Sequence, residues 1–216
     1  VEGSQLQKIA AGSRLTLPVT ILYGLVIWFI SGVIQHQWWI QMACYVLATY
    51  LMILLNNFNA LIRIYSRAIT SAFIILSCVA SFLFPSLEGG IVTVGFVASL
   101  LTIFATYQNR EATGWIYYTF LILGLASVAK VHLLMLIPIY WILMIFLSSI
   151  SLRTFIASLL GLLTPYWFWI TAVLIVYKGN FGSFTSHFLP LTEVDFFYSY
   201  DSIPLSHYLT YAFLVI

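Results

Sequence analysis

Lys130 and His132 interrupt an otherwise apolar stretch, GLASVAKVHLLMLIPIYW, which runs from Gly124 to Trp141. An ammonium group can bind a phosphate, and an imidazole can bind an anion or move a proton. A charge at the centre of a bilayer costs several kcal/mol, whereas a lysine at a helix end reaches the membrane interface at modest cost. The stretch therefore predicts two helices that meet at a turn, with both side chains at that turn.

Carboxylates are the second group of residues that can carry chemistry, because they accept protons from hydroxyl groups and bind metal ions. Glu193 and Asp195 are two residues apart, which on an extended chain puts both side chains on one side. The residues indicate neither a metal site nor any other cofactor, and a divalent metal stays open. The candidates for a catalytic acid or base are Glu88, Glu193, Asp195 and Asp201.

The composition indicates where these residues work. Of the 216 residues, 62% are hydrophobic and 6% are charged, whereas about a quarter of the residues of a soluble domain are charged. The basic residues are too few to form a nucleic-acid patch. No P-loop, glycine-rich dinucleotide motif, HExxH or GxSxG is present, so ATP hydrolysis and zinc proteolysis are not indicated. We expect an integral membrane protein whose partners are lipids and not nucleic acid.

Eight apolar runs approach the length of about 20 residues that a membrane-crossing helix needs. They lack the two-residue alternation of barrel strands, which favours helices. The sequence thus predicts an all-α, polytopic bundle that forms a single transmembrane domain over residues 1–216, with the last helix truncated. The expected spans are 15–34, 38–55, 67–84, 90–107, 114–130, 132–150, 154–177 and 205–216.

The basic residues divide unequally between the two sides that these spans create. Six fall on one side, and only Lys130 and Lys178 fall on the other. By the positive-inside rule the amino terminus is therefore expected to be cytoplasmic. The cytoplasmic residues Arg63 and Arg67 are four apart and share a helix face, where they either anchor lipid phosphates or bind one anionic headgroup. The six are Lys8, Arg14, Arg63, Arg67, Arg110 and Arg153.

The outer side collects the other titratable residues. All four histidines and four of the six acids fall there, which favours a site that opens outward, unless outer loops simply gather polar residues. Residues 178–204 form the longest outer connection, and its aromatic residues either rest on the membrane surface or offer platforms for sugar rings or a lipid tail. Pro138 and Pro165 fall inside the sixth and seventh spans, where we expect each to kink its helix.

From Ala68 to about Tyr177 the order of features resembles the membrane domain of C-type glycosyltransferases. The matching features are the basic RIYSRA, the outer turn FLFPSLEGG, the cytoplasmic TYQNREATGW and the stretch GLASVAKVHLLMLIPIYW, which together cover about half of the chain. In that family an acid in a large first outer loop usually serves as the base. Here the first outer connection, IQHQWW, is short and contains His36 but no acid, so the base is expected among the carboxylates named above.

The resemblance implies transfer of a sugar from a polyprenyl-phosphate donor at the outer face of a bacterial inner (plasma) membrane, as part of cell-envelope synthesis. A carboxylate would deprotonate the acceptor hydroxyl, and Lys130 with His132 would stabilise the departing phosphate. Two other functions stay open, a non-catalytic structural or assembly subunit of a membrane complex and a transporter. The scarcity of ionisable residues at mid-depth counts against the transporter.

Overall fold

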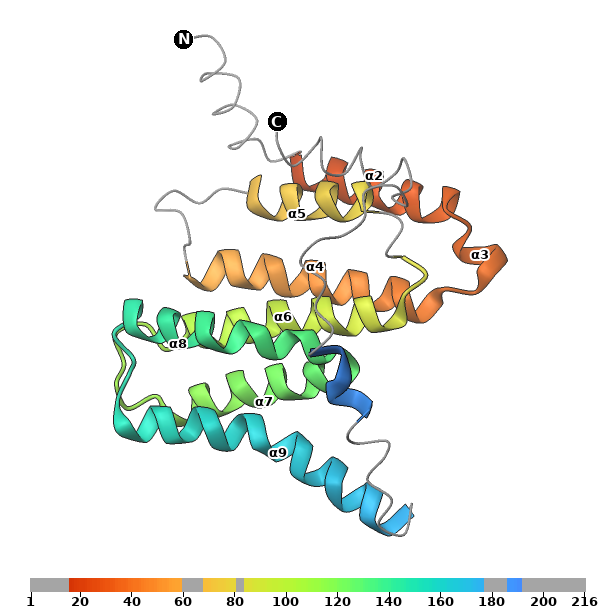
Figure 1. The fold of residues 1–216 in the computed structure, drawn as a ribbon. Coiled ribbons are helices and arrows are strands. Elements are labelled where there is room, and N and C mark those ends of the chain that lie inside the picture. The colour runs from red at the N-terminus through yellow and green to blue at the C-terminus, as the bar shows by residue number, and fades with distance from the viewer. Residues whose placement is uncertain (1–15, 60–67, 81–83, 177–185, 192–216) are drawn as a thin grey trace, which may run out of the picture. The chain divides into compact units, whose positions relative to one another are not determined.

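The computed structural model describes residues 16–59, 68–80, 84–176 and 186–191, and every regular element in these ranges is helical (Figure 1). The all-α prediction is confirmed for this part of the chain. The elements are α2 (Thr16–Ile30), α3 (Val33–His36), α4 (Trp39–Asn59), α5 (Ala68–Val79), α6 (Leu87–Phe104), α7 (Thr113–Ala129), the 3-10 helix η2 (Val131–Leu136), α8 (Ile137–Phe146), α9 (Leu152–Val176) and the 3-10 helix η3 (Leu189–Leu191).

Three helices in the described ranges are long and apolar enough to cross a membrane: Trp39–Asn57, Leu87–Phe104 and Leu152–Ile175. Four shorter apolar helices accompany them: Thr16–Ile30, Ile69–Val79, Thr113–Ala129 and Val131–Phe146. Each of the first seven predicted spans overlaps one of these helices, and the predicted number of eight crossing helices stays a prediction. The eighth predicted span, 205–216, lies outside the described residues.

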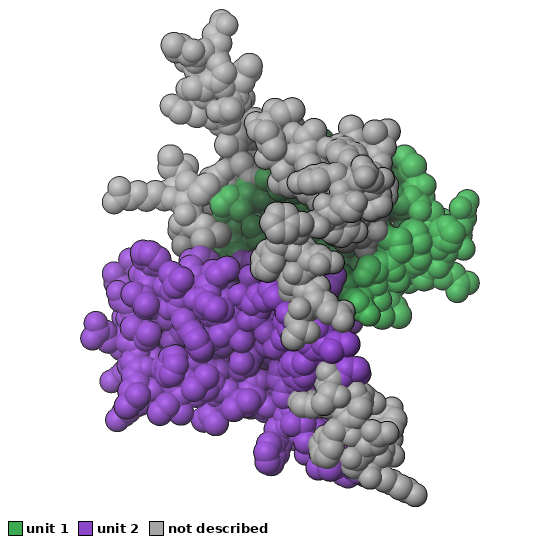
Figure 2. Space-filling model, in the orientation of Figure 1, with its two compact units in different colours: residues 1–90, 199–216 green, residues 91–198 purple. Residues whose placement is uncertain are grey.

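Contacts divide the chain into two compact units, which Figure 2 shows in different colours. Unit 1 comprises Val1–Gly90 and Ser199–Ile216, and unit 2 comprises Ile91–Tyr198. Helix α6 begins in unit 1 and continues into unit 2. Each unit is described by itself below, and the single transmembrane domain stays a prediction.

In unit 1, α5 packs against both α2 and α4. The hydroxyl of Thr20 donates to the hydroxyl oxygen of Ser71 at 3.4 Å, and the hydroxyl of Tyr45 donates to the carbonyl oxygen of Ile74 at 3.3 Å. Trp28 stacks on Phe84 with 3.9 Å between the ring centroids. Side-chain hydroxyls thus join the helices of an apolar bundle, where they have no water to bind.

In unit 2, α7 packs closely against α6 on one side and α9 on another. A Cβ built on Gly95 of α6 would lie 2.5 Å from the Cβ of Ala126, and the hydroxyl of Thr119 donates to that of Thr102 at 2.9 Å. Because earlier residues of α6 meet later residues of α7, these consecutive helices are antiparallel. Consecutive helices that cross a membrane in opposite directions have this arrangement.

Helices α7 and α9 run in the same direction. Gly161 lies against Tyr117, while Pro165, four residues later, lies against Gly124. The two hydroxyls of Tyr117 and Thr164 are 3.1 Å apart. Glycines let the two backbones approach, as small residues do between membrane helices. The apolar core of unit 2 is formed by Ile103, Ile116, Phe120, Leu123, Tyr140, Met144 and Leu147.

The two prolines behave differently. Pro165 lies inside α9, as predicted, and α9 bends partway along its length (Figure 1). Pro138 is the second residue of α8, which follows directly on the 3-10 helix η2, and the predicted kink at Pro138 stays a prediction. A backbone N–H in the first turn of a helix has no partner within the helix, so proline costs nothing there. The 3-10 helix η2 occupies the start of the sixth predicted span.

Candidate functional site

The turn predicted around Lys130 is present. Helix α7 ends at Ala129, and Lys130 follows it with extended backbone angles, φ −145° and ψ 104°. The N–H of Lys130 donates to the carbonyl oxygen of Ala126 at 3.2 Å, and its own carbonyl oxygen accepts from Leu133 at 3.1 Å. Lys130 therefore closes α7 and opens η2. The side chains of Lys130 and His132 are both exposed.

The connections that precede α7 and α9 touch each other at one end of unit 2. The N–H of Gln108 donates to the carbonyl oxygen of Leu147 at 2.9 Å, and the hydroxyl of Ser151 donates to the carbonyl oxygen of Arg110 at 3.3 Å. Arg153 lies in the first turn of α9, two residues beyond this contact. Both arginines thus belong to the same end of unit 2.

Lys130 lies at the opposite end. Helix α7 starts at Thr113, directly after the contact just described, and its 17 residues span about 25 Å at 1.5 Å per residue. Within unit 2, the cations assigned to the cytoplasmic side by sequence are therefore separated from Lys130 by the full length of a helix. The arrangement agrees with the predicted division of charge, and the membrane side of each end stays a prediction.

Residues 186–191 lie against the Lys130 turn. Helix η3 contacts η2, and the Nε2 atom of His187 lies 3.2 Å from the carbonyl oxygen of Ser127. The imidazole also packs edge-on against two aromatic rings. Its centroid is 4.7 Å from that of Trp169 at 86° and 5.4 Å from that of Phe188 at 86°. His187 is half-buried in this setting.

The end of α7 that receives His187 is held by α9. The hydroxyl of Ser127 donates to the carbonyl oxygen of Gly124 at 2.6 Å and lies 2.7 Å from the hydroxyl of Tyr166. Because the one hydroxyl proton of Ser127 is used for Gly124, Tyr166 donates to Ser127. Both side chains are buried, so this hydrogen bond fixes the last turn of α7 relative to α9.

The other predicted site residues are distributed as follows. Glu88 lies exposed in the first turn of α6 and belongs to unit 1, whereas Lys130 and His132 belong to unit 2. The remaining predicted residues lie outside the described ranges: Arg63, Arg67, Glu193, Asp195 and Asp201. Among the described residues, no three or more histidine, cysteine or acidic side chains come close enough to hold a metal ion.

Sequence reasoning placed His187 on the outer side but did not select it, and it missed Ser127, Tyr166 and Trp169. A serine and a tyrosine inside apolar runs were a signal, because buried hydroxyls in lipid need a partner. The identity of that partner depends on a contact across 39 positions of sequence. Periodicity carries no information about such a contact.

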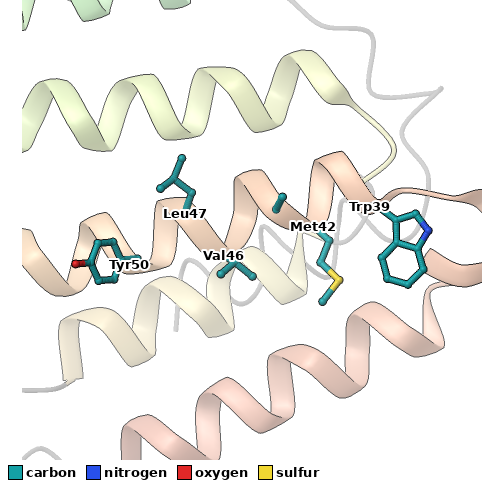
Figure 3. A pocket seen from close by; sticks show the side chains of 6 residues that line it. Trp39, Met42, Val46, Leu47 and Tyr50 are labelled. Carbon is teal, nitrogen blue, oxygen red and sulfur yellow. The ribbon is translucent and has the colours of Figure 1, made fainter.

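A shallow apolar groove of about 550 Å³ runs along one side of α4 (Figure 3). Its residues are three or four apart and so share one helix face. They include no acid, histidine, lysine or arginine, so the groove suits a hydrocarbon chain or an apolar helix and offers no group for acid–base chemistry. The lining residues are Trp39, Met42, Ala43, Val46, Leu47 and Tyr50.

Searches of protein-family models, curated proteins and solved structures found no match to this chain. Its function is therefore inferred from its own residues and their arrangement. Within the described structure, Lys130, His132 and His187 lie at the same end of α7.

Proposed function

We propose that this chain is a multi-pass membrane protein that transfers a sugar from a polyprenyl-phosphate donor at the outer face of a bacterial inner membrane. In this proposal the chain has eight spans and a cytoplasmic amino terminus. The observation that carries the proposal is Lys130, exposed at the break after α7 and a full helix length away from Arg110 and Arg153. That placement suits a lysine at the outer interface, where a lipid phosphate also lies.

Lys130 would bind the phosphate of the donor and stabilise it as the leaving group. The end of α7 itself cannot do so, because the C-terminus of a helix presents carbonyl oxygens and a partial negative charge. Binding at this end therefore depends on the side chain of Lys130, with His132 two residues further along in η2. Glu88, Glu193, Asp195 and Asp201 remain the carboxylates proposed for proton transfer.

A binding measurement with the variant Lys130→Ala tests the proposal. We expect the variant, in nanodiscs, to bind undecaprenyl phosphate at least about tenfold more weakly than the parent, because one charge-assisted interaction contributes about 1.5–3 kcal/mol. Arg153→Ala is the matched control, since it removes an exposed cation from the other end of unit 2. Uncharged undecaprenol should bind both variants equally. Unchanged phosphate binding in Lys130→Ala would refute the role of Lys130.

The groove on α4 favours a second candidate, a non-catalytic subunit of a membrane complex. Its apolar lining could receive an apolar helix of another subunit without any chemistry. The same measurement separates the two candidates. A structural subunit would bind undecaprenyl phosphate no better than undecaprenol, whereas the proposed transferase discriminates between them through the phosphate.

A further inference from the structure

The hydrogen bond between His187 and Ser127 determines which nitrogen of the imidazole carries the proton. A carbonyl oxygen only accepts hydrogen bonds. The Nε2 atom of His187, 3.2 Å from the carbonyl oxygen of Ser127, is therefore the donor and carries the hydrogen. In the neutral ring, Nδ1 then has the free electron pair. A histidine fixed in one tautomer by a partner on its other nitrogen is the arrangement that general bases use.

The orientation of the ring is fixed as well as its tautomer. Trp169 and Phe188 both contact the imidazole edge-on, and the carbonyl of Ser127 belongs to a helix end held by Tyr166. A base that is already oriented loses little entropy in the transition state.

The imidazole is also next to the proposed phosphate site. Ser127 precedes Lys130 by three residues, which is less than one helical turn, and η3 packs on the 3-10 helix that carries His132. A donor whose phosphate is bound by Lys130 would therefore place its sugar at the same end of α7 as His187.

We propose that His187, in place of the four carboxylates named above, is the general base of the transfer, an inference that rests on the proposed function. Nδ1 of His187 takes the proton of the acceptor hydroxyl while the hydroxyl oxygen forms a bond to the anomeric carbon of the sugar. The bond from that carbon to the phosphate oxygen breaks, and its electron pair leaves with the polyprenyl phosphate, which Lys130 stabilises. The reaction then needs no acid in the first outer connection, where the sequence has His36 alone.

The variant His187→Gln separates a base from an anchor. The side-chain amide of glutamine can still donate to the carbonyl oxygen of Ser127, but it cannot accept a proton. With a panel of polyprenyl-phosphate glucose, mannose and arabinose, and octyl glycosides as acceptors, we expect release of polyprenyl phosphate to slow at least about 100-fold. Binding of undecaprenyl phosphate should stay within about threefold of the parent, which also shows that the variant is folded.

A further readout distinguishes a general base from a structural anchor. Free imidazole should raise the rate of His187→Ala at least about tenfold, because it supplies the missing proton acceptor.

The outcomes keep the two proposals apart. If the parent releases polyprenyl phosphate and His187→Gln does so within about threefold, His187 is an anchor and the inference is wrong, while the transferase function stands. If the parent releases none from any donor in the panel, the proposed function fails and the inference fails with it. A slow His187→Gln variant with normal lipid binding and imidazole rescue of His187→Ala supports both.

Discussion

Replacing Gly161 by alanine is expected to destabilise unit 2 by about 2–3 kcal/mol, although alanine is normally the better helix former by about 1 kcal/mol. The added Cβ would collide with the carbonyl oxygen of Tyr117, and it would lie 3.1 Å from the amide nitrogen of Leu121. Both are backbone atoms and cannot rotate away. Helices α7 and α9 would have to move apart, which would also strain the hydrogen bond between Ser127 and Tyr166.

Gly114 provides the matched control, because it lies on α7 and a Cβ built there meets nothing within 4 Å. Gly114→Ala should leave the stability unchanged or raise it slightly. The measurement is reversible unfolding of both variants by sodium dodecyl sulfate in dodecyl maltoside micelles. Equal stability of the two variants would mean that α7 and α9 do not cross as closely as described.

The second large effect concerns the two ends of α7. A cysteine at position 130 should react with a membrane-impermeant maleimide added outside intact cells, whereas a cysteine at position 110 should react only after the membrane is permeabilised. Both positions are exposed, and α7 between them spans about 25 Å, close to the hydrocarbon thickness of about 30 Å. In intact cells we therefore expect labelling at position 130 and none at position 110.

The labelling requires a background without the native thiols. Cys44 and Cys78 both lie in helices of unit 1, so the parent would be the variant with Cys44→Ala and Cys78→Ala, which should give no signal. If positions 110 and 130 react from the same side, α7 does not cross the membrane. The sidedness on which the outer site depends would then be wrong.

Much of the fold could be predicted from composition and charge, because both signals lie within short stretches of the sequence. Apolar runs near span length indicated the helices, and a lysine and a histidine within such a run indicated the break after Ala129. Local backbone geometry was harder to predict from the sequence. The first span was expected to reach residue 34, but α2 ends at Ile30, and Gly32 follows with a φ of 90° that suits glycine. The apolar pattern likewise did not distinguish the 3-10 helix before Pro138 from an α-helix.

The candidate site was less predictable because its contacts join distant parts of the sequence. Lys130 was recognised from its immediate neighbours. The contact of His187 with Ser127 crosses 60 positions, and the partner is a backbone carbonyl, which every residue has. No pattern of residue types specifies such a pair. The role proposed for His187 therefore comes from the folded arrangement, whereas the role proposed for Lys130 came from sequence and stays a prediction.

The central claim is that a lipid phosphate binds at the Lys130 turn, and photo-crosslinking tests it most directly. A polyprenyl phosphate with a diazirine beside the phosphate would be irradiated with the protein in nanodiscs, and the labelled peptides would be identified by mass spectrometry. We predict labels within residues 130–136 and 186–191, which are lost when excess undecaprenyl phosphate competes. Labels at residues 105–112 and 147–153 instead, or a pattern equal to that of a diazirine polyprenol without phosphate, would contradict the claim.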